Sequence, residues 1–138
     1  MLTPLLAAAL ALQAAPAAPP PAAAAPPPPS PPESAITLDQ LPIAQASAAR
    51  CAIAFATVGR WQKAGDPRGS AYPDMEAGAG REFFVQVMAK LMDEAGLTRD
   101  NVITLAFDGV EDHDKPGGAE RVAALMPTCQ TMKSAAGL

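Results

Sequence analysis

Residues 48–61 read AARCAIAFATVGRW, and this stretch decides the fold because its apolar side chains follow a helical period. Cys51, Phe55 and Val58 recur at spacings of four and three, which place them on one face of a helix. The alanines between them favour the helical state and allow a neighbouring helix to approach closely. We therefore expect a helix with a broad apolar face at the centre of the domain.

The same pattern extends in both directions. Upstream it reaches Asp39, with Pro42 tolerated in the first turn, and downstream it stops at Gly65, which Pro67 follows closely. The sequence therefore predicts that the first helix runs from near Asp39 to Gly65.

Three further helices are predicted downstream. The strongest periodicity lies in REFFVQVMAKLMDEAG at 81–96, where polar residues at steps of four mark a solvent-facing stripe. Gly96 is expected to end that helix and Thr98 to cap the next, which runs until Gly109. A fourth helix follows the turn EDHDKPGG, and Pro127 within it is expected to kink or break it. The side chains expected to face the core in the last two helices are Val102, Ile103, Leu105, Ala106, Val122, Leu125, Met126, Cys129 and Met132.

The helices and their connections predict the fold class. No segment alternates apolar and polar residues as a half-buried strand does. Four helices with mostly short connections predict an all-α fold, a small four-helix antiparallel bundle. The first and last helices can be neighbours in such a bundle, so that Cys51 and Cys129 can meet in one seam. We expect a disulfide there that links helix 1 to helix 4.

The composition divides the chain near residue 33. The first 32 residues carry no charged side chain and hold 11 of the 16 prolines. Residues 1–15 are interpreted as a signal peptide, because their apolar run is too short to span a bilayer and small residues follow it. The Lys or Arg that usually precedes such a run is missing. Residues 16–35 are predicted to be a Pro/Ala-rich disordered linker of polyproline II type, and residues 36–138 a helical domain.

Charge limits the classes of partner. The net charge is −4 and the basic residues are scattered singly, so no basic patch can neutralise nucleic acid phosphates. Anionic membrane surfaces are disfavoured for the same reason. We expect no nucleic acid partner and no membrane span after signal removal. The expected location is the periplasm or the medium outside the cell.

The two cysteines lie 78 residues apart, which argues against a redox-active C-x-x-C pair. Two Cys and one His cannot supply four ligands, so a closed Cys/His zinc site within one chain is excluded. An even number of cysteines behind an export signal favours a disulfide, which would stabilise the fold by about 4 kcal/mol in the chain-entropy model. The alternatives are buried free thiols and a cysteine nucleophile with His113 as its base.

The segment DGVEDHDKPGG contains the single histidine of the chain. Asp108, Asp112, His113 and Asp114 could together hold a cation or orient a general base, which would make the protein a metal-assisted enzyme. The alternative is a solvated acidic loop between helices, in which Asp favours turns and caps. The spacing lacks the EF-hand pattern. We expect no catalytic residue, no cofactor and no metal. If a metal is bound after all, these four residues are the candidate ligands.

Two aromatic residues stand near the end of the first helix. Trp61 and Tyr72 could contact a ligand, or they could cover the open end of the bundle. The sequence favours the covering role and leaves the ligand contact open.

Three segments carry a resemblance: RCAIAFA at 50–56, GREFFVQVMAKLMDEAGLT at 80–98 and MPTCQ at 126–130. Together they resemble a group of short, uncharacterised exported helical proteins of Gram-negative bacteria. The layout alone is also similar to the periplasmic acid-stress chaperones, in which one disulfide ties an early helix to a late one. No motif of those chaperones is shared here, and the loop between the cysteines is longer.

These observations predict a non-enzymatic exported domain that binds an unknown envelope protein or small ligand, or has a structural role in the cell envelope. The resemblance in layout implies an alternative, a periplasmic stress chaperone that holds unfolded clients. The metal-assisted enzyme of residues 108–114 is the second alternative.

Overall fold

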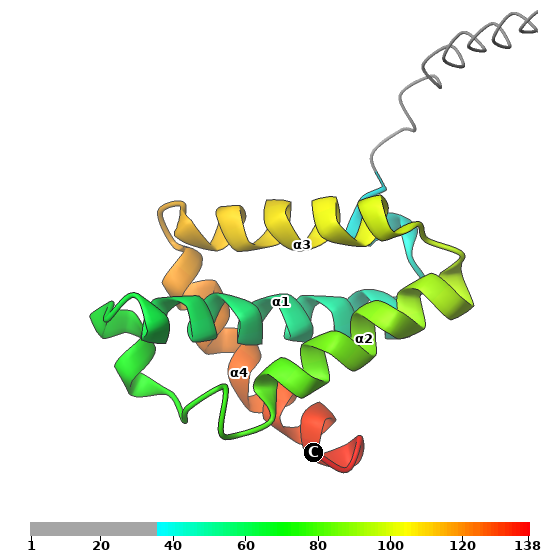
Figure 1. The fold of residues 1–138 in the computed structure, drawn as a ribbon. Coiled ribbons are helices and arrows are strands. Elements are labelled where there is room, and N and C mark those ends of the chain that lie inside the picture. Colours follow the sequence, from blue (N-terminus) through cyan, green and yellow to red (C-terminus); the bar gives the residue numbers. More distant parts are fainter. Residues whose placement is uncertain (1–35) are drawn as a thin grey trace, which may run out of the picture. The chain divides into compact units, whose positions relative to one another are not determined.

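A computed structural model describes residues 36–138, and within that range the chain forms four α-helices and no strand (Figure 1). The predicted all-α antiparallel bundle is confirmed. The predicted signal peptide (1–15) and linker (16–35) lie outside the described residues. None of the described helices is long and apolar enough to cross a membrane. The helices are α1 Ile43–Lys63, α2 Gly80–Ala95, α3 Arg99–Asp114 and α4 Gly118–Ala135, with short 3-10 turns η1 Leu38–Gln40 and η2 Pro67–Ala71.

The helix that contains the opening stretch, α1, lies in the middle of the bundle. Figure 1 shows α3 alongside α1, with α2 and α4 crossing it, and all three helices contact α1. A helix with neighbours on several sides must be apolar around most of its circumference. This explains why α1 buries side chains on several faces, among them Cys51, Ile53, Phe55 and Val58.

The start of α1 differs from the prediction. The α-helix begins at Ile43, and residues 38–40 form a separate 3-10 turn. Proline disfavours the helical conformation in the residue before it. Leu41, which precedes Pro42, is accordingly extended with φ −84° and ψ 152°. Pro42 therefore delimits the helix and does not lie inside its first turn.

The junction between α2 and α3 forms as the sequence predicts. Gly96 takes the left-handed conformation with φ 66°, and the Leu97 amide donates to the Leu91 carbonyl at 3.3 Å. The Thr98 hydroxyl then accepts from the Asn101 amide at 3.2 Å, which caps α3. These contacts satisfy backbone groups that both helix ends would otherwise leave unpaired.

The acidic segment 108–114 is not a loop, which corrects the prediction. Gly109 does not end α3; the helix continues to Asp114, and the chain turns after it with Gly117 at φ 79°. The reason is close packing: a Cβ built on Gly109 would lie 2.8 Å from Ile53 Cγ2 on α1. Glycine is kept inside the helix because it allows α3 to approach α1 there.

Pro127 does not break α4, so that part of the prediction is wrong. The helix continues from Gly118 to Ala135 through the proline. Proline removes one backbone hydrogen bond and crowds the carbonyl four residues earlier. Buried side chains on both sides of it, Val122 and Met126 before and Cys129 after, anchor the helix to the core.

The predicted disulfide is confirmed. Cys51 on α1 and Cys129 on α4 are bonded, with their Cα atoms 5.1 Å apart and both side chains buried. Next to Cys51 in the core, Phe55 meets Phe83 of α2 edge to face, with ring centroids 5.5 Å apart. On this face, the disulfide joins α1 to α4 and the aromatic pair joins α1 to α2.

Candidate functional site

The candidate metal ligands do not converge. Asp108, Asp112 and Asp114 are exposed on α3, whereas His113 turns into the bundle and is 8% exposed. Within residues 36–138 no group of three or more His, Cys, Asp or Glu side chains is placed to hold a metal ion. The helical conformation separates these side chains around α3, because consecutive residues point in directions about 100° apart.

Two of these aspartates join α3 to its neighbours. Asp112 accepts from Arg121 of α4 at 3.1 Å and pairs with Lys115 at 3.3 Å, and the Lys115 hydrogen bond lowers the pKa of this carboxyl. Asp114 accepts from Arg60 of α1, and that hydrogen bond lowers its pKa. Both carboxylates therefore serve as interhelix ion-pair partners.

His113 is bonded inside the interface between α1 and α3. The Thr57 hydroxyl, which is fully buried, donates to the Ile53 carbonyl at 2.9 Å. It also lies 2.9 Å from His113 Nδ1. Because the single hydroxyl hydrogen goes to Ile53, Nδ1 is the donor to Thr57. This bond satisfies a buried polar side chain, as a helix interface requires.

Stability is expected to fall when the pH drops from 8 to 5. Burial is the main cause that lowers the pKa of His113; the charge of Arg121 adds to it, and Asp112 and Asp114 oppose it. The unfolded chain therefore binds a proton at a pH where the folded chain does not, which favours unfolding as the pH falls through about 6.5. The change should level off below the lowered pKa of the folded state.

The measurement is urea unfolding at several pH values for the wild type and for His113→Gln. The variant should show a flat profile between pH 8 and 5. The carboxylates with lowered pKa values titrate at a lower pH than His113 does; the pKa of Asp66, for example, is about 2. A wild-type profile as flat as that of the variant would contradict the role of His113.

Trp61 covers an end of the bundle. It is 2% exposed, its indole N–H donates to Asp114 at 3.4 Å, and the Arg68 guanidinium lies 4.5 Å from the ring centroid. Tyr72 is half-buried near it, at the end of η2. The structure therefore places Trp61 in the core, in line with the covering role.

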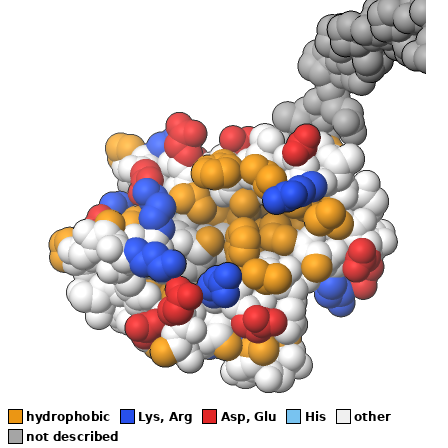
Figure 2. Space-filling model, in the orientation of Figure 1, with side chains coloured by type: hydrophobic (Ala, Val, Ile, Leu, Met, Phe, Trp, Pro, Cys, Tyr) orange, Lys and Arg blue, Asp and Glu red, His pale blue; other side chains and the backbone are white. Residues whose placement is uncertain are grey.

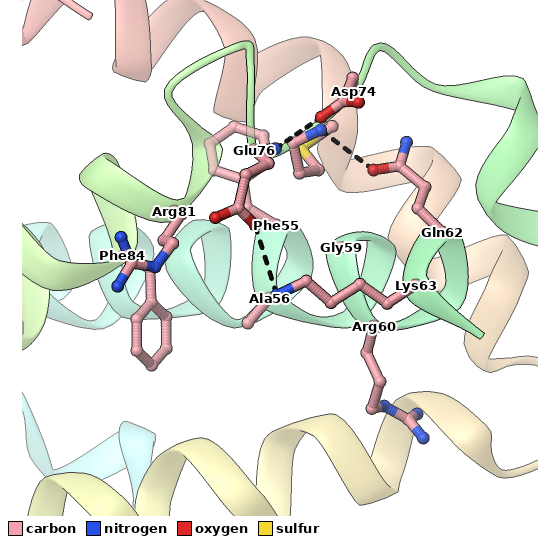
Figure 3. A pocket seen from close by; sticks show the side chains of 11 residues that line it. Phe55, Ala56, Gly59, Arg60, Gln62, Lys63, Asp74, Glu76, Arg81 and Phe84 are labelled. Carbon is pink, nitrogen blue, oxygen red and sulfur yellow. Dashed lines mark hydrogen bonds and ion pairs between the residues drawn. The ribbon is translucent and has the colours of Figure 1, made fainter.

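A pocket of about 430 Å³ opens where α1, the loop at 74–76 and α2 meet (Figure 3). Gln62 holds this loop: its amide N–H groups lie within hydrogen-bond distance of the Gly69, Tyr72 and Pro73 carbonyls, and its carbonyl accepts from Met75 N at 3.0 Å. This role of Gln62 is not predicted from the sequence, because hydrogen bonds from a helix to a following loop leave no periodic signal.

The walls of the pocket are apolar and its rim is charged. Phe55, Ala56 and Phe84 supply apolar lining. The charged residues of the pocket are Arg60, Lys63, Arg81, Asp74 and Glu76. Figure 3 shows Phe84 and Arg60 extending from α2 and α1 toward α3. The volume lies within the range of about 300–1,000 Å³ that is typical of small-molecule sites.

An apolar stripe runs along α3. Ile103, Phe107 and Val110 are followed by Asp114 at spacings of four, three and four, which keeps all four on one flank of the helix. The opposite flank carries Asp112 and contacts α4, so the stripe faces the gap toward α2. Phe107 is 71% exposed, and Ile103, which the sequence analysis expected to face inward, is 40% exposed.

A second stripe runs along the flank of α2 that faces this gap, and it begins at the pocket with Arg81 and Phe84. Figure 2 shows hydrophobic side chains gathered between α3 and α2, where α1 passes beneath, with Lys and Arg side chains at the margin. We name this surface the α2–α3 groove. Its residues are Phe84, Met88 and Met92 of α2, Ile103, Phe107 and Val110 of α3, and Ala56 of α1.

No family model, no curated protein and no solved structure matches this chain. The groove therefore has to be interpreted from its own residues. A contiguous exposed apolar patch with a polar rim is the usual mark of an interaction site on a monomeric protein.

Proposed function

We propose that this protein is an exported, non-enzymatic binding domain of the cell envelope, whose binding surface is the α2–α3 groove. The observation that carries the proposal is the exposure of Phe107 and Ile103 on one flank of α3, at the gap toward α2 where apolar side chains gather (Figure 2). Folding gains little from an aromatic ring that stays in water, so its role is sought in binding.

The arrangement of the polar groups supports binding over catalysis. His113 and Thr57 are bonded to each other away from this pocket, and Asp112 and Asp114 are held in ion pairs. A general base has to be free to reach the proton that it removes. Of the two carboxylates that line the pocket, Asp74 accepts from the backbone amides of Glu76 and Ala77, and Glu76 pairs with Lys63.

Export is supported by the disulfide together with the leader that the sequence predicts. Disulfides form and persist in oxidising compartments such as the periplasm. The Cys51–Cys129 bond is buried in the core, so folding in an oxidising compartment would seal it away from reductants.

The test is native mass spectrometry of the full chain, purified from its own host without reductant. We expect a mass that lacks about the first 15 residues, one intact disulfide, and a bound molecule or protein. Phe107→Asp should lose the bound species. Ile43→Asp is the matched control, because Ile43 is 87% exposed at the start of α1 and outside the groove, and it should retain it. A bound species that survives Phe107→Asp, or none on the wild type, would contradict the proposal.

A further inference from the structure

The charges along the groove differ from those of the whole chain. The net charge is −4, yet the α2 stripe begins with Arg81 and continues with Phe84, Met88 and Met92 at spacings of three and four. The acidic residues of α2 fall on other faces of the helix, because none of them occupies these positions. The groove therefore presents an apolar track with Arg81 at its pocket end. Of the carboxylates that line the pocket there, Glu76 pairs with Lys63 and Asp74 accepts from backbone amides.

Arg81 is the available cation of this pocket. Arg60 is paired with Asp114 and Lys63 with Glu76 at 3.3 Å. Arg81 is exposed and forms no ion pair within residues 36–138. It stands beside Phe84 at the rim (Figure 3), so one anionic group could bind Arg81 while an apolar chain enters the groove.

The length of the groove suits one alkyl chain. Eleven residues separate Arg81 from Met92, which corresponds to about 16 Å along α2. Across the gap, α3 presents Ile103 and Phe107, which are 40% and 71% exposed. At the pocket end, Ala56 on α1 is half-buried, and its small side chain leaves room for the alkyl chain above it.

From this geometry we infer that the α2–α3 groove binds one medium-chain fatty acid, with its carboxylate on Arg81 and its alkyl chain along the two stripes. The inference rests on the proposed binding function and names its ligand class. Guanidinium binds carboxylate through two parallel N–H donors, which gives the head group a fixed position. A cationic amphiphile would be repelled by Arg81, and a bilayer is disfavoured by the net negative charge.

The experiment is isothermal titration of the full disulfide-bonded chain with octanoate, decanoate and dodecanoate, each below its micelle concentration. Binding should be one to one, and affinity should rise about threefold to fourfold for each added methylene, as burial of a methylene predicts. Arg81→Gln should weaken dodecanoate binding about tenfold, as loss of a charged hydrogen bond predicts. The same variant should leave dodecanol binding unchanged. Lys90→Gln is the matched control, since Lys90 pairs with Glu94 on another face of α2, and it should bind as the wild type does.

Phe107→Asp should abolish binding without loss of fold, because Phe107 is largely exposed. Equal affinity of the wild type for dodecanol and dodecanoate would overturn the role of the carboxylate. Absence of saturable fatty acid binding would overturn the inference. The proposed binding function would still stand if the native mass spectrum showed a bound species that Phe107→Asp removes. A dimer that buries Phe107, or binding only to vesicles of neutral or anionic phospholipid, would also overturn it.

Discussion

Replacement of Cys51 and Cys129 by alanine is expected to lower the free energy of unfolding by about 4 kcal/mol, as closure of a loop of this length predicts. A domain of this size has a total stability of about 5–15 kcal/mol, so the double variant should be close to unfolding at 37 °C. The disulfide is the covalent link between the first and last helices.

The loss should be greatest in α4. Apart from Gly118, that helix buries Val122, Met126 and Cys129, so one of its three buried side chains is the disulfide itself. Urea unfolding followed by far-UV circular dichroism should give the free energy difference. Hydrogen exchange should show that amides of α4 lose protection before those of α2.

Urea unfolding of the wild type in the presence of dithiothreitol, which reaches the buried bond once the core opens, is the control, and it should reproduce the midpoint of the double variant. A double variant within about 1 kcal/mol of the wild type would contradict the expectation, since chain entropy alone predicts several times that loss. Packing of Val122 and Met126 against the core would then be sufficient to hold α4.

Local signals allowed much of the fold to be predicted. The helix predicted at 81–96 spans Gly80–Ala95, and Gly96 and Thr98 take their predicted capping positions. Each of these features depends on residues within one or two turns of one another. The disulfide was predictable for another reason: with two cysteines in the chain, one pairing was possible.

The missed features depend on how the helices surround α1. Local sequence predicts a helix end at Gly109, because the residue that it packs against, Ile53, is 56 residues away. The contact between Thr57 and His113 also spans 56 residues. Periodicity identifies which side chains share a flank, but the neighbour that covers that flank is set by tertiary packing.

The same limit applies to the α2–α3 groove. Ile103 and Phe107 share a flank of α3 at a spacing of four, which the sequence displays. From the sequence, Ile103 was expected to be buried. Because α2 and α4 contact other sides of α1, neither helix covers this flank of α3. Its apolar side chains are therefore exposed and do not join the core.

Trp61→Ala is expected to lower the free energy of unfolding by about 3–5 kcal/mol, the range found for deletion of a large buried aromatic side chain. The indole is 2% exposed and packs where α1, α3 and η2 meet, with Asp114 on its N–H and Arg68 over its ring. Deletion removes the ring and leaves a cavity. Urea unfolding must be followed by circular dichroism, because Trp61 is the single tryptophan of the chain.

Phe107→Ala is the matched control for this loss. It also deletes an aromatic ring from a helix, but from one that is 71% exposed, so we expect a change within about 0.5 kcal/mol. A loss below about 1 kcal/mol for Trp61→Ala would contradict the structure at this end of the bundle, given the usual penalty for a buried aromatic. If Phe107→Ala leaves stability unchanged and removes the bound species, the ring at position 107 serves binding and not folding. A large loss of stability would instead show that α3 needs Phe107 for its own packing.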